Sequence, residues 1–429
     1  NLKLVARNGN LTYLTPASLW NELSSQSLRK FIFNNYKINF LYQFENKKRF
    51  KDVDLRFKFA IFQITNSQIP ESSFKVQFLI QNDDTIIQEI TNNLKLLENK
   101  SIAYKGLDLS IDKIKKFSHI QEAVIEFKNN EELILLSKLF NQFKVLSDKY
   151  INFKKGIDPS VNNNKNLLKE DVSNKSGYIF LYQGANIHQF NSRYFEHKSS
   201  KEKSKLLWIS NKNKEKILPN ENLGNSNSIS ILYRSIASDT NERTMISTLV
   251  PRDCYCTNSI YISYDNHGKI QMSIYKKLFI ISIFNSLTFD FLIRKFVNIN
   301  VQKSCLYQCP MPQPEEAEIL NVPLNLTLAR NACILTVKNN PDSFKELLNL
   351  KYFNFTEAEK QKILNLKIED EFFEEVENEI NFIVAYLYSL NFEDFRILLE
   401  DFKVLKKKKG DIYILSLING YKNYLTQNQ

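Results

Sequence analysis

The stretch Tyr233-Arg-Ser-Ile-Ala-Ser-Asp-Thr-Asn-Glu-Arg-Thr244 decides how the middle of the chain is interpreted. Short apolar runs precede and follow it, Ile229 to Tyr233 and Met245 to Val250, and runs of this length predict strands. Similar runs occur at Tyr178 to Tyr182 and at Ser259 to Ser263. Residues 177–325 are therefore predicted to form a β-rich domain that contains this polar stretch with its two arginines.

The same domain is predicted to end in a helix. The apolar residues from Ile274 to Phe296 predict one long helix, and Pro310, Pro312 and Pro314 close the unit. The lysine-rich segment from Lys198 to Lys216 is predicted to be a loop between the strands, either contacting phosphates or forming a disordered surface strip.

Residues 1–83 alternate between strand and helix patterns. Strand patterns at Leu11 to Pro16, Ile38 to Phe44 and Arg56 to Ile64 accompany a helical pattern from Ser18 to Tyr36. This order is typical of the edge of an α/β sheet.

The other two segments are predicted to be mainly helical. From about Asp84 the apolar period is helical as far as Tyr150, and a polar linker around Asn162 to Asn166 completes residues 84–176. Residues 326–429 are predicted to form an acidic helical domain, with Lys406 to Lys409 as a solvated loop. The predicted fold class is α/β plus α+β.

The 429-residue chain is basic, with 58 Lys and Arg against 47 Asp and Glu and a formal net charge of +11. Only 11 of these cations are Arg, and the wealth of Lys, Asn, Ile, Phe and Tyr reflects AT-rich codons in part. The first sixty residues nevertheless hold eleven cations and four anions. This concentration favours a surface that faces a polyanion.

Glycine and proline are scarce, and their spacing excludes several cofactor sites. No two of the nine glycines lie within six residues of each other, so neither G-x-G-x-x-G nor a P-loop is present. No two of the ten prolines are adjacent. The chain therefore has no recognisable loop for a dinucleotide, S-adenosylmethionine or a triphosphate.

The cysteines and histidines do not predict a metal site. Cys254 and Cys256, with Cys305 and Cys309, could supply four thiolates to zinc, but their spacing is not the C-x2-C of zinc ribbons. Five cysteines also form no disulfide framework, and no apolar run reaches the ~20 residues of a membrane span. A cytoplasmic protein without a membrane partner is expected. Because the first residue is Asn, we expect a piece of a longer polypeptide.

Five stretches, in chain order, resemble the adenine-specific DNA methyltransferases of type IIG-like restriction–modification systems and of phage-defence systems. The stretch at Tyr233–Thr244 is similar to the family's R-x-I-A-x-x-T-N-x-R-T signature, which is long and specific. The other four are 15–59, after the family's catalytic motif; 181–193, similar to G-x-x-I-x-Q-F/Y; 285–312, similar to N-S-x-x-x-D-x-x-x-R…P-x-P; and 380–402, similar to its C-terminal helix pair.

The resemblance implies a division of the chain into four parts. Residues 1–83 would be the C-terminal strands of the methyltransferase catalytic sheet and 84–176 a helical connector. Residues 177–325 would be a mixed, β-rich target-recognition domain and 326–429 a C-terminal helical domain.

The family transfers a methyl group from S-adenosylmethionine to an adenine flipped out of double-stranded DNA. Its glycine-rich cofactor loop and its Asn-Pro-Pro-Tyr-like motif are both missing from this sequence. S-adenosylmethionine is therefore expected for the full-length enzyme, whereas this chain alone is expected to bind no cofactor, to contain no catalytic residue and to be inactive.

The resemblance also implies where DNA is contacted. Phe50 is the candidate that stacks on the flipped base, with Phe57 and Phe44 as alternatives. Six residues are candidates for DNA binding, since Arg and amide side chains suit phosphates and base edges: Gln189, Arg193, Arg234, Asn241, Arg243 and Thr244.

Two alternatives stay open at this point. Arg234 and Arg243 could instead hold the fold through buried ion pairs with Asp239 or Glu242. The chain could also be a stand-alone DNA specificity subunit that partners a separate catalytic methyltransferase chain, rather than a part of one enzyme, or an inactive remnant.

Overall fold

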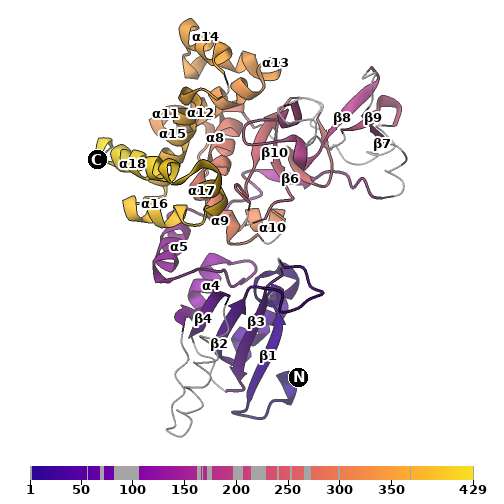
Figure 1. Ribbon diagram of the computed structural model, residues 1–429, viewed down its shortest axis with the longest axis vertical. Helices are drawn as coiled ribbons and strands as arrows, with labels where there is room; N and C mark the ends of the chain where they lie inside the picture. The colour runs from indigo at the N-terminus through magenta and orange to yellow at the C-terminus, as the bar shows by residue number, and fades with distance from the viewer. Residues whose placement is uncertain are drawn as a thin grey trace. The chain divides into compact units, whose positions relative to one another are not determined.

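The computed structural model describes residues 2–55, 57–67, 72–81, 106–161, 166, 168–171, 176–196, 206–213, 229–238, 241–251, 254–264, 272–297, 300–367 and 369–428. The chain divides into two compact units, Asn1–Asn141 and Gln142–Gln429 (Figure 1). The four predicted segments are finer than these units, and their boundaries stay predictions. The described residues form a mixed α/β structure with three sheets.

A five-stranded sheet organises the first unit. Its order is β1-β3-β2-β4-β5, and all neighbours are antiparallel except β2 and β4, which are parallel. The strands are β1 (Asn10–Pro16), β2 (Lys37–Phe44), β3 (Phe59–Thr65), β4 (Ser73–Ile80) and β5 (Leu107–Ser110). The strands predicted at Leu11 to Pro16 and Ile38 to Phe44 are confirmed, whereas β3 begins later than predicted and Arg56 lies outside the described residues.

The helix predicted from Ser18 to Tyr36 is broken into pieces. It consists of α1 (Ser18–Asn21), the 3-10 turn η2 (Leu23–Ser25) and α2 (Gln26–Asn35), because Glu22 adopts an extended backbone. Arg29 stabilises this break, since its buried guanidinium donates to the carbonyl oxygens of Leu19 at 2.8 Å and Glu22 at 2.7 Å. The other helices of this unit are η1 (Leu2–Leu4), α4 (Ile111–Phe117) and α5 (Asn130–Gln142).

Two four-stranded sheets occur in the second unit. One is antiparallel with the order β11-β10-β13-β6, and the other has the order β12-β8-β9-β7, with β12 and β8 parallel. The strands are β6 (Asn152–Lys155), β7 (Leu168–Glu170), β8 (Tyr178–Tyr182), β9 (Leu207–Ser210), β10 (Ser230–Arg234), β11 (Ser247–Val250), β12 (Tyr255–Cys256) and β13 (Ile260–Tyr264). The four predicted strands are confirmed as β8, β10, β11 and β13.

The long helix predicted from Ile274 to Phe296 is two helices, α8 (Ile274–Asn285) and α9 (Leu287–Arg294). Ser286 separates them in an extended conformation, and its hydroxyl accepts from the Phe289 amide at 3.2 Å to cap α9. Helix α8 is apolar around most of its circumference, and it is buried in contact with β11 and α12.

The remaining helical elements belong to the second unit, and those from α12 onward confirm the predicted helical character of residues 326–429. They are η4 (Gly184–Asn186), η5 (Tyr194–Glu196), η6 (Asn211–Asn213), α10 (Lys303–Leu306), α11 (Glu316–Asn321), α12 (Pro323–Asn339), α13 (Pro341–Phe344), η7 (Lys345–Asn349), η8 (Lys351–Phe353), α14 (Glu357–Asn365), α15 (Glu371–Leu387), α16 (Phe392–Leu399), α17 (Lys403–Lys409) and α18 (Asp411–Gln427).

Two predicted loops are wrong where the structure describes them. The segment Lys198 to Lys216 contains strand β9, whose Trp208 and Ile209 are buried, and the rest of it is described only at 206–213. The run Lys406 to Lys409 is part of helix α17, and three of its lysines pair with Asp411, Glu242 and Glu374. Most of the predicted linker around Asn162 lies outside the described residues.

Candidate nucleic-acid interface

The polar stretch between β10 and β11 ends in a buried ionic cluster. Arg243 donates from Nε to the Asp290 carboxylate of α9 at 2.7 Å, and the Thr244 amide donates to both oxygens of the same carboxylate at 3.1 Å. Arg294, one turn further along α9, donates to Asp290 at 3.0 Å. Asp290 has no exposed surface, so this carboxylate depends on its three donors for compensation.

The junction between α8 and α9 receives the same stretch of chain. The Asn285 carbonyl oxygen accepts from the Arg243 guanidinium and, at 2.9 Å, from Gln189 Nε2. The Asn285 side chain exchanges hydrogen bonds with the backbone of Ser247 on β11 at 2.9 and 3.0 Å. Asn285 and Asp290 together therefore fix how β11 and the connection from β10 approach helices α8 and α9. We call Gln189, Arg243, Asn285, Asp290 and Arg294 the junction network.

The C-terminal helices close this network. The guanidinium carbons of Arg294 and Arg243 lie 4.4 and 5.9 Å from the centre of the Phe402 ring. Arg294 also donates to the backbone carbonyls of Asn241 and Glu242, both at 2.9 Å. Asn241 is therefore held through its main chain, which leaves its amide side chain out of these contacts.

Arg234, at the end of β10, occupies a different setting. Its guanidinium is partly buried, and burial lowers its pKa, although the nearby Tyr194 opposes the shift. Gly184 makes room for this side chain, because a Cβ there would lie 3.2 Å from the Arg234 Cγ. The Arg234 Nε has no hydrogen-bond partner among the described residues. Arg193, just before η5, is partly exposed as well.

His188 lies in the surroundings of Arg234 and is neutral at ordinary pH. Burial lowers its pKa to about 4; the Glu242 carboxylate opposes that shift, and Arg243, Arg234 and Lys408 add to it. Its ring lies 4.7 Å from the ring of Tyr194. A neutral imidazole removes one competing positive charge from the surroundings of Arg234.

The structure thus separates the six residues predicted to bind DNA into two groups. Gln189, Arg243 and Thr244 meet at the junction network and Asn241 contributes its carbonyl, whereas Arg193 and Arg234 keep exposed surface. The predicted buried-pair partners are wrong for Arg243: its partner is Asp290, and Glu242 pairs with Lys408 at 2.7 Å. Asp239 lies outside the described residues.

Asn285, Asp290 and Arg294 belong to the motif-like stretch 285–312, but the sequence alone assigns no role to these three residues. The useful signal was Asp290 and Arg294 four residues apart in an apolar helix, because a charged pair there needs compensation in the core. Nothing in the sequence named Arg243 as the third member, since 47 residues separate it from Asp290.

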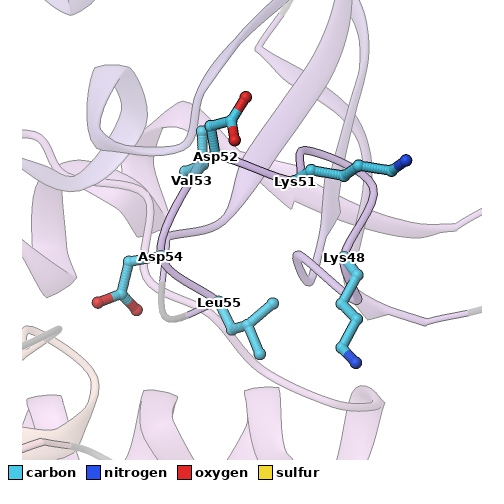
Figure 2. A pocket seen from close by; sticks show the side chains of 6 residues that line it. All are labelled: Lys48, Lys51, Asp52, Val53, Asp54 and Leu55. Carbon is cyan, nitrogen blue, oxygen red and sulfur yellow. The ribbon is translucent and has the colours of Figure 1, made fainter.

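A second candidate place lies in the first unit, on the loop between β2 and β3. A pocket of about 440 Å³ is lined by Lys48, Lys51, Asp52, Val53, Asp54 and Leu55. The two lysines extend on one side of the loop and the two aspartates on the other (Figure 2). Charged residues of both signs therefore line the pocket together with Val53 and Leu55.

Two side chains shape that loop. Asn46, which is buried, donates to the Val53 carbonyl at 3.1 Å and accepts from the Phe50 amide at 3.2 Å. Arg49 donates to the Gln81 carbonyl at 2.7 Å, which attaches the loop to the end of β4. The base-stacking candidate Phe50 therefore has a fixed backbone at its amide.

The three candidate aromatic residues for base stacking differ in exposure. Phe44 is 4% exposed and its ring is stacked on Phe59 at 5.0 Å, so its faces are covered. Phe50 is 39% exposed and meets Phe59 edge-on at 5.1 Å. Phe57 is 52% exposed. Phe50 and Phe57 therefore both offer ring surface, and Phe50 stays the predicted stacking residue.

Four of the five cysteines, all of which belong to the second unit, are buried, and Cys305 is partly exposed. Cys254 and Cys256 belong to an apolar cluster with Leu232, Ile260 and Ile262, and burial raises the pKa of both thiols. No group of three or more potential metal ligands occurs in the described ranges. No helix in the described part of the chain combines the length and apolar character needed to cross a membrane.

No protein-family model matches this sequence, and no curated protein matches it. Among solved structures, the chain is similar to the type IIL restriction–modification enzyme MmeI in complex with DNA, at 12% identity and a TM-score of 0.48, over 94% of this chain and 50% of that one. It is also similar to the type IIG restriction endonuclease BpuSI, at 11% identity and a TM-score of 0.34, over 90% of this chain and 48% of that one. The chain spans about half the length of both enzymes, and at these scores neither likeness identifies its function.

Proposed function

We propose that this chain is the DNA-binding and target-recognition region of a site-specific DNA adenine-N6 methyltransferase from a restriction–modification or phage-defence system. The junction network is the observation that carries the proposal. Three stretches that resemble separate motifs of that family, 181–193, 233–244 and 285–294, converge on Asn285 and Asp290. Motifs far apart in sequence that share one buried network are expected when the resemblance reflects a common architecture.

The buried and the partly exposed arginines have different proposed roles. Arg243 and Arg294 hold the β10–β11 connection against α9 and are the frame of the domain. Arg234 and Arg193 are partly exposed residues, and an arginine suits the bidentate recognition of a phosphate or a guanine edge. We assign DNA contact to these two, with Asn241 as a candidate base reader, because its side chain is absent from the junction network.

For the first unit, we propose the C-terminal strands of the methyltransferase sheet. Strand β1 is an edge of its sheet in the described part of the chain, and five of its seven residues are exposed, including Tyr13 and Leu14. An edge exposed on both faces is a surface on which another strand can pair. An upstream catalytic domain, or a separate methyltransferase chain, would supply that strand together with the S-adenosylmethionine site.

Selection from a random duplex DNA library tests target recognition directly. The purified chain should enrich one short sequence over several rounds, and Arg234→Ala and Asn241→Ala should each relax the preference at particular base pairs, by about 1–3 kcal/mol for each lost contact. Binding without any enriched sequence would contradict target recognition while leaving DNA binding intact. Repeating the selection with a separate methyltransferase chain present would distinguish the specificity-subunit alternative.

Base stacking by Phe50 has its own test. Phe50→Ala should weaken binding of a single-stranded oligonucleotide by about 1–3 kcal/mol, the range found for loss of one base–aromatic stack. Phe57→Ala is the matched control, because that ring is more exposed and lies on the same loop. A larger effect at Phe57 than at Phe50 would transfer the role to Phe57.

A further inference from the structure

Several cations of the second unit are neutralised by nearby carboxylates in the described part of the chain. Ion pairs join Lys276 to Glu315, Lys295 to Asp401, Arg330 to Glu359, and both Glu393 and Glu400 to Arg396. The lysine run of α17 is paired in the same way, as described above. Net positive charge on this unit must therefore be sought where lysines lack such partners.

Strand β6 carries such lysines. Lys154 and Lys155 end the strand, and Lys303 at the start of α10 donates to Asn152 Oδ1 at 2.6 Å. None of these three lysines has an ion pair with a carboxylate of the described residues. We call these three residues the β6 lysines.

Each of the β6 lysines lies over a tyrosine ring. Lys154 Nζ is 4.6 Å from the centre of the Tyr264 ring, Lys155 Nζ is 5.9 Å from that of Tyr261, and Lys303 Nζ is 5.4 Å from that of Tyr307. A ring attracts the cation without neutralising its charge, so the ammonium groups stay available to an anion.

The position of β6 brings these charges to one border of the sheet. β6 is the last strand in the order β11-β10-β13-β6, and it pairs with β13 on one side only in the described part of the chain. Successive side chains of a strand point to opposite faces of the sheet, so the side chains of Lys154 and Lys155 lie on opposite faces at this border. Lys303 is bonded to Asn152 and therefore lies on the face of Lys154.

The charges of this border repel one another. Burial lowers the pKa of Lys303; the Asp148 carboxylate opposes that shift, and the Lys154 ammonium adds to it. Hydrogen bonds from Ser160 lower the pKa of the Asp158 carboxyl, and the nearby charge of Lys155 adds to that shift. Two carboxylates at longer range thus face three ammonium groups, and an additional anion would relieve the remaining repulsion.

We infer that the β6 lysines form a phosphate-contacting border that holds the DNA backbone independently of its sequence. The inference rests on the proposed DNA-binding function and adds a second, non-reading surface to it. Lysine is suited to this task because it contacts phosphates as a point charge and carries no base information. The rival explanation is that lysines on an edge strand prevent another strand from pairing with it.

The test compares two triple variants with the same change in charge. One is Lys154→Gln/Lys155→Gln/Lys303→Gln; the control is Lys345→Gln/Lys351→Gln/Lys367→Gln, exposed lysines of the acidic C-terminal helices. Affinity for two unrelated duplexes is measured by fluorescence anisotropy between low and moderate salt. Each lost phosphate contact lowers the slope of log affinity against log salt by about 0.9, so the β6 variant should lose about 2.7 and the control none.

The outcomes separate the inference from the function on which it rests. If the unsubstituted chain binds DNA and the β6 variant keeps its slope, the inference is overturned and the proposed function stands. If the unsubstituted chain binds no DNA, both fail. Equal weakening on both duplexes, with restoration by Lys154→Arg/Lys155→Arg/Lys303→Arg, supports the phosphate border. A β6 variant that self-associates in light scattering yet keeps the slope supports edge protection instead.

Discussion

Replacing Asp290 by Asn should cost this protein a large part of its stability. The substitution keeps the size of the side chain but removes the charge that faces Arg243 at 2.7 Å and Arg294 at 3.0 Å. Both guanidinium groups are nearly covered, at 6% and 7% exposure, so water cannot replace the lost carboxylate. Two buried cations would then lose the carboxylate that both of them contact.

The size of the effect follows from the burial of the cluster. Breaking a buried pair by removing one partner typically costs about 3–5 kcal/mol, and here one carboxylate serves two cations and an amide. We therefore expect Asp290→Asn to lower the free energy of unfolding by at least about 3 kcal/mol. Urea denaturation followed by circular dichroism measures this change.

An exposed ion pair provides the matched control. Glu393→Gln removes one of the two carboxylates that pair with Arg396, where the side chains are largely exposed, and should change stability by less than about 1 kcal/mol. If Asp290→Asn also changed stability by less than about 1 kcal/mol, the junction network would not be what holds this region together. Arg243→Ala should then lower DNA binding without unfolding the protein, the opposite of the result expected here.

Three further predictions concern other buried groups. Arg29→Met should lower the free energy of unfolding by about 3 kcal/mol or more in urea denaturation, because the Arg29 side chain is fully buried. The substitution removes the guanidinium that donates to the carbonyls of Leu19, Glu22, Gln121 and Glu122. A loss below about 1 kcal/mol would contradict this. The pKa of His188 falls from 6.5 to about 4 on folding, so the unfolded chain binds its proton first and stability should fall by about 2–3 kcal/mol as pH drops from 6.5 to 4. His188→Gln should remove that part of the pH dependence, and an unchanged profile would mean that the imidazole is not shielded in the folded protein. Gly156→Ala should lower stability by about 1–3 kcal/mol in thermal unfolding, because a Cβ there would lie 2.2 Å from the Thr257 carbonyl oxygen. A Cβ at Gly177 would meet no atom within 4 Å, so Gly177→Ala should cost only its backbone strain. Equal effects at the two glycines would refute the close-contact explanation.

The sequence predicted the elements whose apolar pattern is local. The strands β1, β2, β8, β10, β11 and β13 each fall on a short apolar run, and their limits differ from the prediction by a residue or two. The same pattern failed at α8 and α9, because apolar residues continue across Ser286 while a hydroxyl cap interrupts the helix. It failed again at α17, where lysines were taken for a loop although acidic residues far along the chain neutralise them.

The candidate site divides in the same way. Motif resemblance brought attention to Gln189, Arg234 and Arg243, yet the roles of these residues depend on contacts over long sequence distances. Arg243 is buried because Asp290 lies 47 residues away in the sequence and opposite it in space. Arg234 packs closely on Gly184, 50 residues earlier, where a Cβ would lie 3.2 Å from the Arg234 Cγ. Burial of this kind cannot be read from the neighbours of a residue in the chain.

Binding of duplex DNA by the purified 429-residue chain, measured by fluorescence anisotropy at increasing salt, tests the central claim most directly. The proposed function predicts measurable affinity at low salt and a linear fall of log affinity with log salt, with a slope of several units that reflects several phosphate contacts. A chain that remained folded but retained no duplex at low salt would contradict the proposed role in DNA recognition.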